Sequence, residues 1–276
     1  MENVLINIDS KFRNIEKYPN PGNFTYILKD PLKNINFIRL SSIELPTTYY
    51  TFLAAYDNIS FSISKPNGIY FTITIDEGNY SSENMIEIIQ YKLNINNTLY
   101  NTNFLITWNE INYKITISDT ASFSLILGND NKHRSLGHRL GYIFDDSNYL
   151  AKNQVSASDK YKWVSDSFLN ITKDEYLFVR INDYGVIYND LREKSLLAKI
   201  ILSDAQFVID NGSNFLTKTY IFKQLINLSK FEIELINQYG QTVDMNYIDF
   251  SITLEVGQIY DSNDYNKYNF DLRKRY

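Results

Sequence analysis

The sequence of 276 residues contains no cysteine and only two histidines, His133 and His138. Without cysteine the chain can form no disulfide and no thiolate zinc site. With only two histidines and no cysteine, a Cys–His or Ser–His nucleophile is nearly excluded. The sequence patterns of serine hydrolases, zinc proteases, P-loops and dinucleotide-binding turns are also missing. We therefore expect a protein that is not an enzyme and has no catalytic residue, cofactor or metal.

Proline and long apolar runs are scarce as well. All five prolines lie at or before Pro66, so the rest of the chain can form strands without interruption. No stretch approaches the roughly 18 apolar residues of a membrane-spanning helix. Residues 1–14 lack the basic start and the apolar run of a signal peptide. We expect a soluble protein that is made in the cytosol and has no membrane span.

Positive charge is not in excess, since 27 Lys and Arg stand against 32 Asp and Glu and give a net charge of −5. A nucleic-acid-binding domain usually carries a basic face and a high isoelectric point. We therefore expect no specific nucleic-acid partner.

Aromatic residues are abundant, with 23 Tyr and 17 Phe, and they suit the half-buried faces of strands. Phe250–Val256 alternates apolar and polar residues and is the clearest half-buried strand. About a dozen such short segments are separated by turn signals. This pattern predicts an all-β, mainly antiparallel fold, a β-sandwich of which the jelly roll is the most economical version.

Other segments refine this prediction. Ile35–Leu45 changes phase after Ile38, which predicts a bulge in a long strand, and Lys29–Pro31 before it predicts a turn. Glu175–Ile181 is apolar on both faces, which favours a central strand. Thr47–Tyr56 lacks periodicity and is interpreted as a loop covering one end of the sandwich. Further strands are predicted at Phe24–Leu28, Ile59–Ile63, Ser195–Leu202, Ala205–Ile209 and Phe231–Leu235.

The stretch Phe71–Leu93 combines a strand, a turn at Asp76–Asn79 and the only strongly helical pattern in the chain. Its apolar helical face is formed by Met85, Ile86, Ile88, Ile89 and Leu93. An Asn-rich connector is expected at Asn94–Asn103, followed by a hairpin at Phe104–Ile117 and a third strand at Ser122–Leu127. These elements predict an inserted β-α-β-β-β unit carrying one short amphipathic helix.

The predicted organisation is an N-terminal arm or edge strand (1–22), a jelly-roll-like sandwich (23–66 together with 167–256), an inserted β-rich unit (67–145), a linker loop (146–166) and a C-terminal arm (257–276).

Charged clusters were considered as sites. Lys132–Arg139 holds both histidines and could bind phosphate or an acidic partner, but a solvated loop is the favoured interpretation. The carboxylate pairs Asp76-Glu77 and Asp145-Asp146 are adjacent in sequence and are interpreted as turns. Asp261–Asp264 lacks the glycine and glutamate of a calcium loop. The residues proposed for interactions are Tyr49, Tyr50, Lys132, His133, Arg134, Arg139, Arg273, Lys274 and Arg275.

Several short segments, in order along the chain, resemble structural proteins of large double-stranded DNA viruses of eukaryotes, the nucleocytoplasmic (giant virus) group, and their virophage relatives. They are Ile8–Arg13, Phe24–Tyr26, Ile38–Pro46 with Tyr49-Tyr50, Gly78–Tyr80 with the helix, Leu140–Tyr142, Tyr239-Gly240 and Asp249–Val256. The resemblance implies a virion component, a minor capsid protein with β-sandwich folds. It supplies no catalytic residues.

Two functions from different classes follow as expectations. The first is a penton-like or cement-like capsid protein that binds neighbouring capsid proteins, the major capsid protein among them, and assembles as a homo-oligomer or as part of a larger shell. The second is a binding module that attaches to host glycans through tyrosines on loops, for example as part of a fibre.

Overall fold

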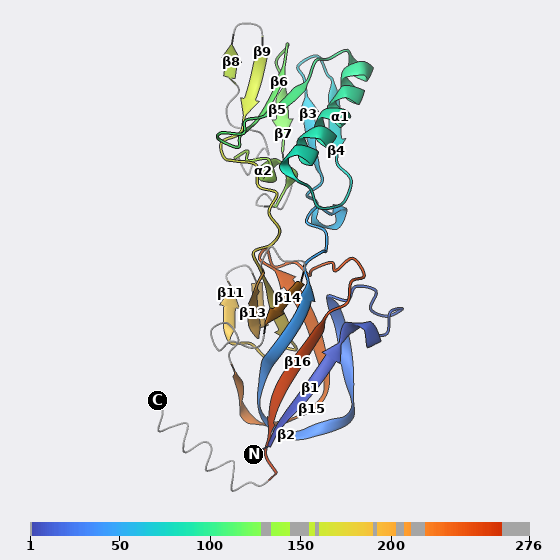
Figure 1. Ribbon diagram of the computed structural model, residues 1–276, viewed down its shortest axis with the longest axis vertical. Coiled ribbons are helices and arrows are strands. Elements are labelled where there is room, and N and C mark those ends of the chain that lie inside the picture. Colours follow the sequence, from blue (N-terminus) through green and yellow to red (C-terminus); the bar gives the residue numbers. More distant parts are fainter. Residues whose placement is uncertain are drawn as a thin grey trace. The chain divides into compact units, whose positions relative to one another are not determined.

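A computed structural model of the chain describes residues 2–127, 134–143, 155–157, 160–189, 192–202, 207–210 and 219–260. The chain divides into two compact units (Figure 1). The terminal unit comprises Met1–Tyr49 and Asp174–Tyr276, and the inserted unit comprises Tyr50–Lys173. Each unit has its own hydrophobic core, and the strands that the structure describes pair antiparallel. The predicted all-β, sandwich-like class is confirmed.

The terminal unit is built on one curled sheet in the order β1-β16-β2-β15-β10-β13, with β14 paired to the end of β2. Its elements are β1 (Glu2–Asp9), the 3-10 helix η1 (Ser10–Phe12), β2 (Asn23–Pro46), β10 (Tyr176–Ile181), the β11–β12 hairpin (Ile187–Asn189 and Arg192–Leu196), β13 (Ala198–Ile201), β14 (Phe207–Asp210), β15 (Tyr220–Asn237) and β16 (Ser251–Gln258).

Strand β2 is 24 residues long and organises this sheet, because it pairs with β15 along one side and with β16 along the other. The predicted turn at Lys29–Pro31 is wrong. The register with β15 jumps there from Ile27 to Leu32, so the strand bulges and continues without reversing. A bulge suits Pro31, which has no N–H to donate to a ladder. The bulge predicted in Ile35–Leu45 is confirmed by two register shifts against β16.

Strand β10 lies between β15 and β13, as its two apolar faces predict. Leu177, Val179 and Ile181 are buried in the main core of the terminal unit. On the other face Phe178 packs with Leu196 and Ile236 in a small second cluster. The prediction of a central strand at Glu175–Ile181 is therefore confirmed.

The inserted unit holds two small sheets, β4-β3-β7 and β5-β6-β9-β8, and a helix that packs on β4 and β5 (Figure 1). Its elements are η2 (Ala54–Tyr56), β3 (Ser60–Ser64), β4 (Tyr70–Thr74), α1 (Ser82–Tyr100), β5 (Leu105–Trp108), β6 (Ile115–Asp119), β7 (Ser124–Ile126), α2 (Leu136–Arg139), β8 (Val155–Ala157) and β9 (Lys160–Val164). The predicted hairpin is confirmed as β5–β6, whereas β7 pairs with β3.

Helix α1 starts at the N-cap Ser81, whose hydroxyl accepts a hydrogen bond from the N–H of Asn84. Met85, Ile89 and Leu93 are fully buried, and this confirms the predicted apolar face. The helix runs to Tyr100, so most of the expected connector is helical. Tyr100 stacks on Phe71, and the Asn97 side chain bonds both backbone groups of Phe104. Packing and side-chain bonding here outweigh the weak helix propensity of asparagine.

Unit boundaries also differ from the prediction. The insertion begins at Tyr50, so β3 belongs to it and not to the sandwich. The expected linker ends in β9, which pairs with β6 inside the inserted unit. The expected N-terminal arm contains β1, an edge strand of the main sheet, and β16 extends to Gln258. Among the described residues no helix has the length and apolarity needed to cross a bilayer.

Candidate functional site

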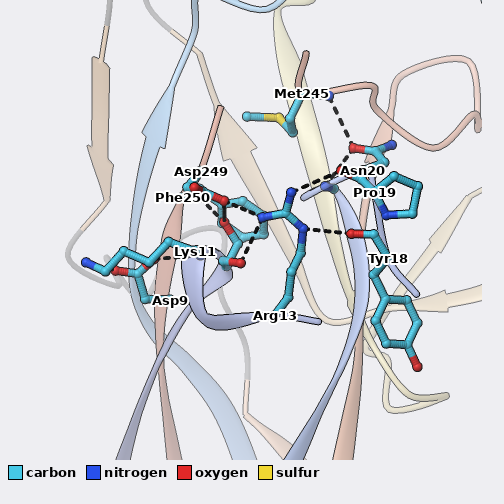
Figure 2. A network of polar contacts seen from close by, with 11 residues as sticks. Asp9, Lys11, Arg13, Tyr18, Pro19, Asn20, Met245, Asp249 and Phe250 are labelled. Carbon is cyan, nitrogen blue, oxygen red and sulfur yellow. Dashed lines mark hydrogen bonds and ion pairs between the residues drawn. The ribbon is translucent and has the colours of Figure 1, made fainter. Parts of the chain in front are cut away.

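Arg13 lies at the centre of a polar network in the terminal unit (Figure 2). Its side chain is only 3% exposed, and Nη1 lies 2.5 Å from Oδ1 of Asp249. The same guanidinium donates to three carbonyl oxygens, those of Ser10, Tyr18 and Pro19, at 2.8–3.0 Å. Arginine suits this position because its rigid fork presents five donors and stays charged. The network therefore holds the loop after β1 against the start of β16.

Ser10 completes this network through its hydroxyl and its backbone N–H. Its hydroxyl donates to Oδ1 of Asp249 at 2.8 Å and accepts from the N–H of Phe250 at 2.9 Å. Its own N–H donates to the carbonyl of Phe250 at 2.9 Å. The residues joined lie about 240 positions apart, since Ser10 and Phe250 are separated by 240. We call Ser10, Arg13, Tyr18, Pro19, Asp249 and Phe250 the Arg13 network.

A second polar contact follows in the same loop. Asn20 donates from Nδ2 to the carbonyl of Val243 and accepts at Oδ1 from the N–H groups of Gly22 and Met245 (Figure 2). A Cβ atom at Gly22 would lie 2.3 Å from the Val243 carbonyl oxygen, so only glycine fits. The segment Asn20–Gly22 thus explains, in structural terms, the Pro-Asn-Pro-Gly punctuation of the sequence.

A shallow pocket of about 240 Å³ lies beside the network. Its lining residues are Asp9, Lys11, Glu44, Asp249, Phe250 and Ser251. The carboxylates already have partners, because Lys11 pairs with Asp9, the Ser251 hydroxyl donates to Glu44, and Arg13 pairs with Asp249. No group of three or more potential metal ligands occurs in the described part of the chain.

Asp9 shows how these partners act on a carboxyl group. Burial works toward a higher pKa, but the hydrogen bonds and charge of Lys11 outweigh it and lower the pKa of Asp9. Its Oδ1 accepts from the N–H of Lys11 and caps η1. A carboxylate held ionised as a cap serves the local fold, and it is poorly suited to donate a proton in a reaction.

The predicted aromatic pair is split by burial. Tyr49 is 1% exposed and packs in the core of the terminal unit, so it offers no surface for an interaction. Tyr50 is half-buried and belongs to the inserted unit. The loop interpretation of Thr47–Tyr56 is close to the structure, since only η2 is regular there, but this segment carries the chain from one unit to the other.

The basic stretch is not a solvated loop where the structure describes it. Arg134 and Arg139 are fully buried in the inserted unit, around the short helix α2. The Arg134 guanidinium lies 3.6 Å from the ring centroid of Tyr56, and Arg139 donates from Nη1 to the carbonyl of Thr172. The contacts with the aromatic ring and with the carbonyl oxygen offset part of the free energy that it costs to remove these two charges from water.

Five of the proposed interaction residues lie outside the described residues: Lys132, His133, Arg273, Lys274 and Arg275. The same holds for the acidic pair Asp145-Asp146 and for Asp261–Asp264. Their predicted roles stay predictions.

Asp76 and Glu77 take local roles before α1. Glu77 accepts from the N–H of Ala54 at 2.9 Å, and Gly78 forms a bridge with Phe52. Asp76 lies 3.8 Å from the ammonium of Lys92. These contacts support the interpretation of the pair as part of a turn.

A groove of about 380 Å³ runs along the outer side of α1. Its lining residues are Asp76, Tyr80, Asn84, Glu87, Ile88 and Tyr91. Burial and the nearby charge of Asp76 raise the pKa of Tyr80, and its hydroxyl already donates to the carbonyl oxygen of Asp76. Two tyrosine rings and two carboxylates along one groove form the kind of surface that can bind a sugar.

The sequence indicates that the segments Ile8–Arg13 and Asp249–Val256 resemble parts of viral structural proteins, but it does not predict the contact between them. Neither segment signals its partner locally, because the ion pair joins residues separated by 236 positions. The local signal that was available is the serine and arginine at spacing three next to a loop rich in proline, glycine and asparagine.

The sequence profile of a family of unknown function, DUF5901, matches residues 1–249. The chain belongs to this family. The match covers the whole inserted unit and the terminal unit as far as residue 249, so β16 of this DUF5901 member lies beyond it.

No curated protein matches this DUF5901 chain. Among solved structures, it is similar to a crystal structure of the mavirus penton protein, with 12% sequence identity and a TM-score of 0.45. The alignment covers 94% of this chain and 100% of that chain.

Proposed function

We propose that the chain is a non-enzymatic structural protein of a virion, a minor capsid component of penton or cement type that binds neighbouring capsid proteins. One observation carries the proposal. The segments that resemble viral structural proteins at the two ends of the chain, Ile8–Arg13 and Asp249–Val256, are the segments that build the Arg13 network. Their polar side chains tie strands together, which suits a scaffold more than a catalyst.

The proposal includes the location and the partners. The protein would be made in the host cytoplasm and incorporated into the capsid, where the major capsid protein would be a neighbour. Its surfaces for these contacts would be the β-sandwich of the terminal unit and the chain's two ends.

Purified particles test this proposal. We expect the protein to co-sediment with capsids through a density gradient, at a fixed ratio to the major capsid protein measured by mass spectrometry. Deletion of its gene should abolish or destabilise particles. Absence from particles, with normal particle yield after deletion, would show that the role is not structural. An icosahedral shell has five-fold vertices, so a penton protein is expected as five copies at each vertex, about 60 copies per shell. A measured copy number near that value would favour a penton.

The C-terminal segment gives a narrower test. Strand β16 ends at Gln258, and Ile259 still bonds to the carbonyl of Asn34. Truncation after Tyr260 should therefore leave the melting temperature unchanged while weakening incorporation into particles. Replacing only Arg273, Lys274 and Arg275 by serine separates their charge from the rest of the segment. Full incorporation of both variants would remove this segment from the proposal.

A second function, attachment to glycans, is favoured by the groove along α1 with Tyr80 and Tyr91. Aromatic rings stack on sugar faces and carboxylates accept sugar hydroxyls. A glycan array with the purified chain should then give a specific signal that Tyr91→Ala removes. Tyr113→Ala, which changes another exposed tyrosine of the inserted unit, serves as the matched control. No signal above background would dismiss this second function.

A further inference from the structure

Strand β1 forms one edge of the main sheet among the strands that the structure describes. It pairs with β16 from Glu2 to Asp9 without a register shift. The N–H of Ser10 donates to the carbonyl of Phe250 and continues the same register, so the even-numbered residues exchange hydrogen bonds with β16. Asn3, Leu5 and Asn7 therefore direct their N–H and C=O groups away from β16. No strand in the described ranges pairs with them on that side.

This edge lacks the features by which proteins usually block unwanted pairing. Between its charged ends, Glu2 and Asp9, it has no charge, no proline and no bulge. The opposite edge of the sheet differs, because β13 has four residues and includes Lys199. A regular edge of eight residues, uncharged from Asn3 to Ile8, is a template for an added strand.

The edge is also held in place before any partner arrives. The Arg13 network fixes the chain directly after β1, and Ile6 and Ile8 are buried in the core. A strand that is already ordered loses little conformational entropy when another strand pairs with it. Leu5, in contrast, is 64% exposed on the outer face.

We propose that β1 pairs antiparallel with β1 of a second copy of this chain, with the two Leu5 residues on the two-fold axis. Because the outward-facing odd residues must face odd residues, the register can move only in steps of two. Centring the pair on Leu5 pairs the seven residues Glu2–Ile8, as many as centring it on Ile6, and it also places the exposed Leu5 side chains of the two copies opposite each other. Asn3 then faces the partner's Asn7, and Val4 faces the partner's Ile6. The charged Glu2 faces the partner's Ile8, so no like charges are opposed.

This pairing would bury two exposed leucines. The amide side chains of Asn3 and Asn7, which already bond Glu255 and Thr253 of the same chain, would lie opposite each other across the pair. The pairing also explains why one edge of the sheet is long and uncharged while the other is short and carries a lysine. The inference concerns the purified chain in solution and does not depend on the proposed capsid role.

A single cysteine tests the register, since the chain has none of its own. Residues opposed in a hydrogen-bonded antiparallel pair have Cα atoms about 5.5 Å apart, which lies inside the range for a disulfide. Mild oxidation of Leu5→Cys should therefore give a covalent dimer at micromolar protein. Ile111→Cys is the matched control, because Ile111 is 90% exposed in the inserted unit.

Sedimentation measures the association itself. The unmodified chain should form a dimer whose population rises with concentration. Leu5→Lys, which places two ammonium groups on the axis, should weaken dimerisation at least tenfold, whereas Ile111→Lys should not. Leu5→Pro removes an N–H that points away from β16, so it should also weaken dimerisation. The melting temperature of each variant shows that the fold is kept.

Three outcomes would overturn the inference. One is a monomer at every concentration together with equal cross-linking of Leu5→Cys and Ile111→Cys. Another is a dimer that Leu5→Lys and Leu5→Pro leave intact. The third is pairing at Leu5 that appears only when a different capsid protein is added, because the partner would then not be a second copy.

Discussion

Arg13 shows what a nearly buried charge does in this protein. Its ion pair with Asp249 is joined by hydrogen bonds to three carbonyl groups, and all its nitrogens are used. Removing the Arg13 side chain would leave three carbonyl oxygens and the Asp249 carboxylate without their donor. The free energy lost in this way is larger than the contribution of a surface ion pair. The pair between Lys11 and Asp9 is of the surface kind, since Lys11 is exposed.

Arg13→Ala should therefore lower the free energy of unfolding of the terminal unit by about 2–4 kcal/mol. Lys11→Ala, the control, should change it by less than about 1 kcal/mol. Urea denaturation followed by far-ultraviolet circular dichroism measures both. Equal effects of the two substitutions would show that the Arg13 network contributes no more than a surface pair.

Tyr142 gives a pH-dependent prediction. Its hydroxyl donates to the carbonyl of Trp163, and burial raises the pKa of Tyr142 well above its usual value. The folded state therefore keeps the phenol neutral while the unfolded chain ionises above pH ~10. The contribution of the neutral, buried Tyr142 to the free energy of unfolding is complete below that pH and is lost as the pH rises further.

Tyr142→Phe should cost about 1 kcal/mol at pH 8, because the buried carbonyl loses its donor. Above pH 10 the difference in free energy of unfolding between the two proteins should shrink. The unmodified chain then loses stability because Tyr142 ionises only in the unfolded state, whereas the Tyr142→Phe variant has no group to ionise at this position. Denaturation at pH 8, 9, 10 and 10.5 measures this difference. A difference that stays constant or grows with pH would contradict the assignment.

At the scale of single residues, the sequence shows which side chains can form polar contacts but not which residues they contact. Ser10, Arg13 and Asp249 were recognised as parts of motifs, yet their contact joins the two ends of the chain. Arg134 and Arg139 were read as solvent-facing because charge runs usually are, and tertiary packing against Tyr56 and Thr172 overrides that rule.

At the scale of elements, helix α1 separates a buried face from an exposed one. Met85, Ile89 and Leu93 recur every four residues and are buried, while Tyr91, Ile95 and Leu99 recur at the same spacing on an exposed face. Alternation and helical periodicity predicted the core-facing residues well, because burial sets that pattern directly.

Leu93→Ala should destabilise the inserted unit by about 2–5 kcal/mol, since it leaves a cavity among buried side chains. Leu99→Ala offers the same change in the same helix at a side chain that is 69% exposed, and it should cost less than about 1 kcal/mol. Thermal unfolding of the two variants compares them. Similar losses would mean that the exposed face of α1 is covered in solution.

Lengths and pairings of elements were less predictable. β2 and β15 are single strands of 24 and 18 residues, where the sequence suggested shorter pieces. Their register shifts let turn-like residues such as Asp30 and Pro31 sit in bulges, so the local turn signal was correct about irregularity and wrong about reversal.

At the scale of the whole molecule, the chain consists of two units with separate cores. The sequence indicated an insertion, but its boundaries depend on which strands pair, and β3 and β9 reveal their partners only in three dimensions.

The inserted unit should fold by itself, because its core residues all come from within Tyr50–Lys173. A fragment of residues 50–173 is expected to unfold cooperatively and to keep dispersed amide resonances. Leu93→Ala in the fragment should lower the midpoint by about as much as in the full chain. A fragment without cooperative unfolding would show that the inserted unit needs the rest of the chain.

The contact between Ser10 and Phe250 has a consequence for synthesis on the ribosome. β1 is translated first, but its partner β16 emerges some 240 residues later, as the separation of this pair shows. At 5–20 residues per second, the interval is on the order of 10 to 50 seconds. Throughout that time the segment Asn3–Ile8 has no native strand to pair with, while the inserted unit can already be complete. Nascent chains held on crowded polysomes would therefore expose the same uncharged strand side by side, where the earliest contacts between copies could form.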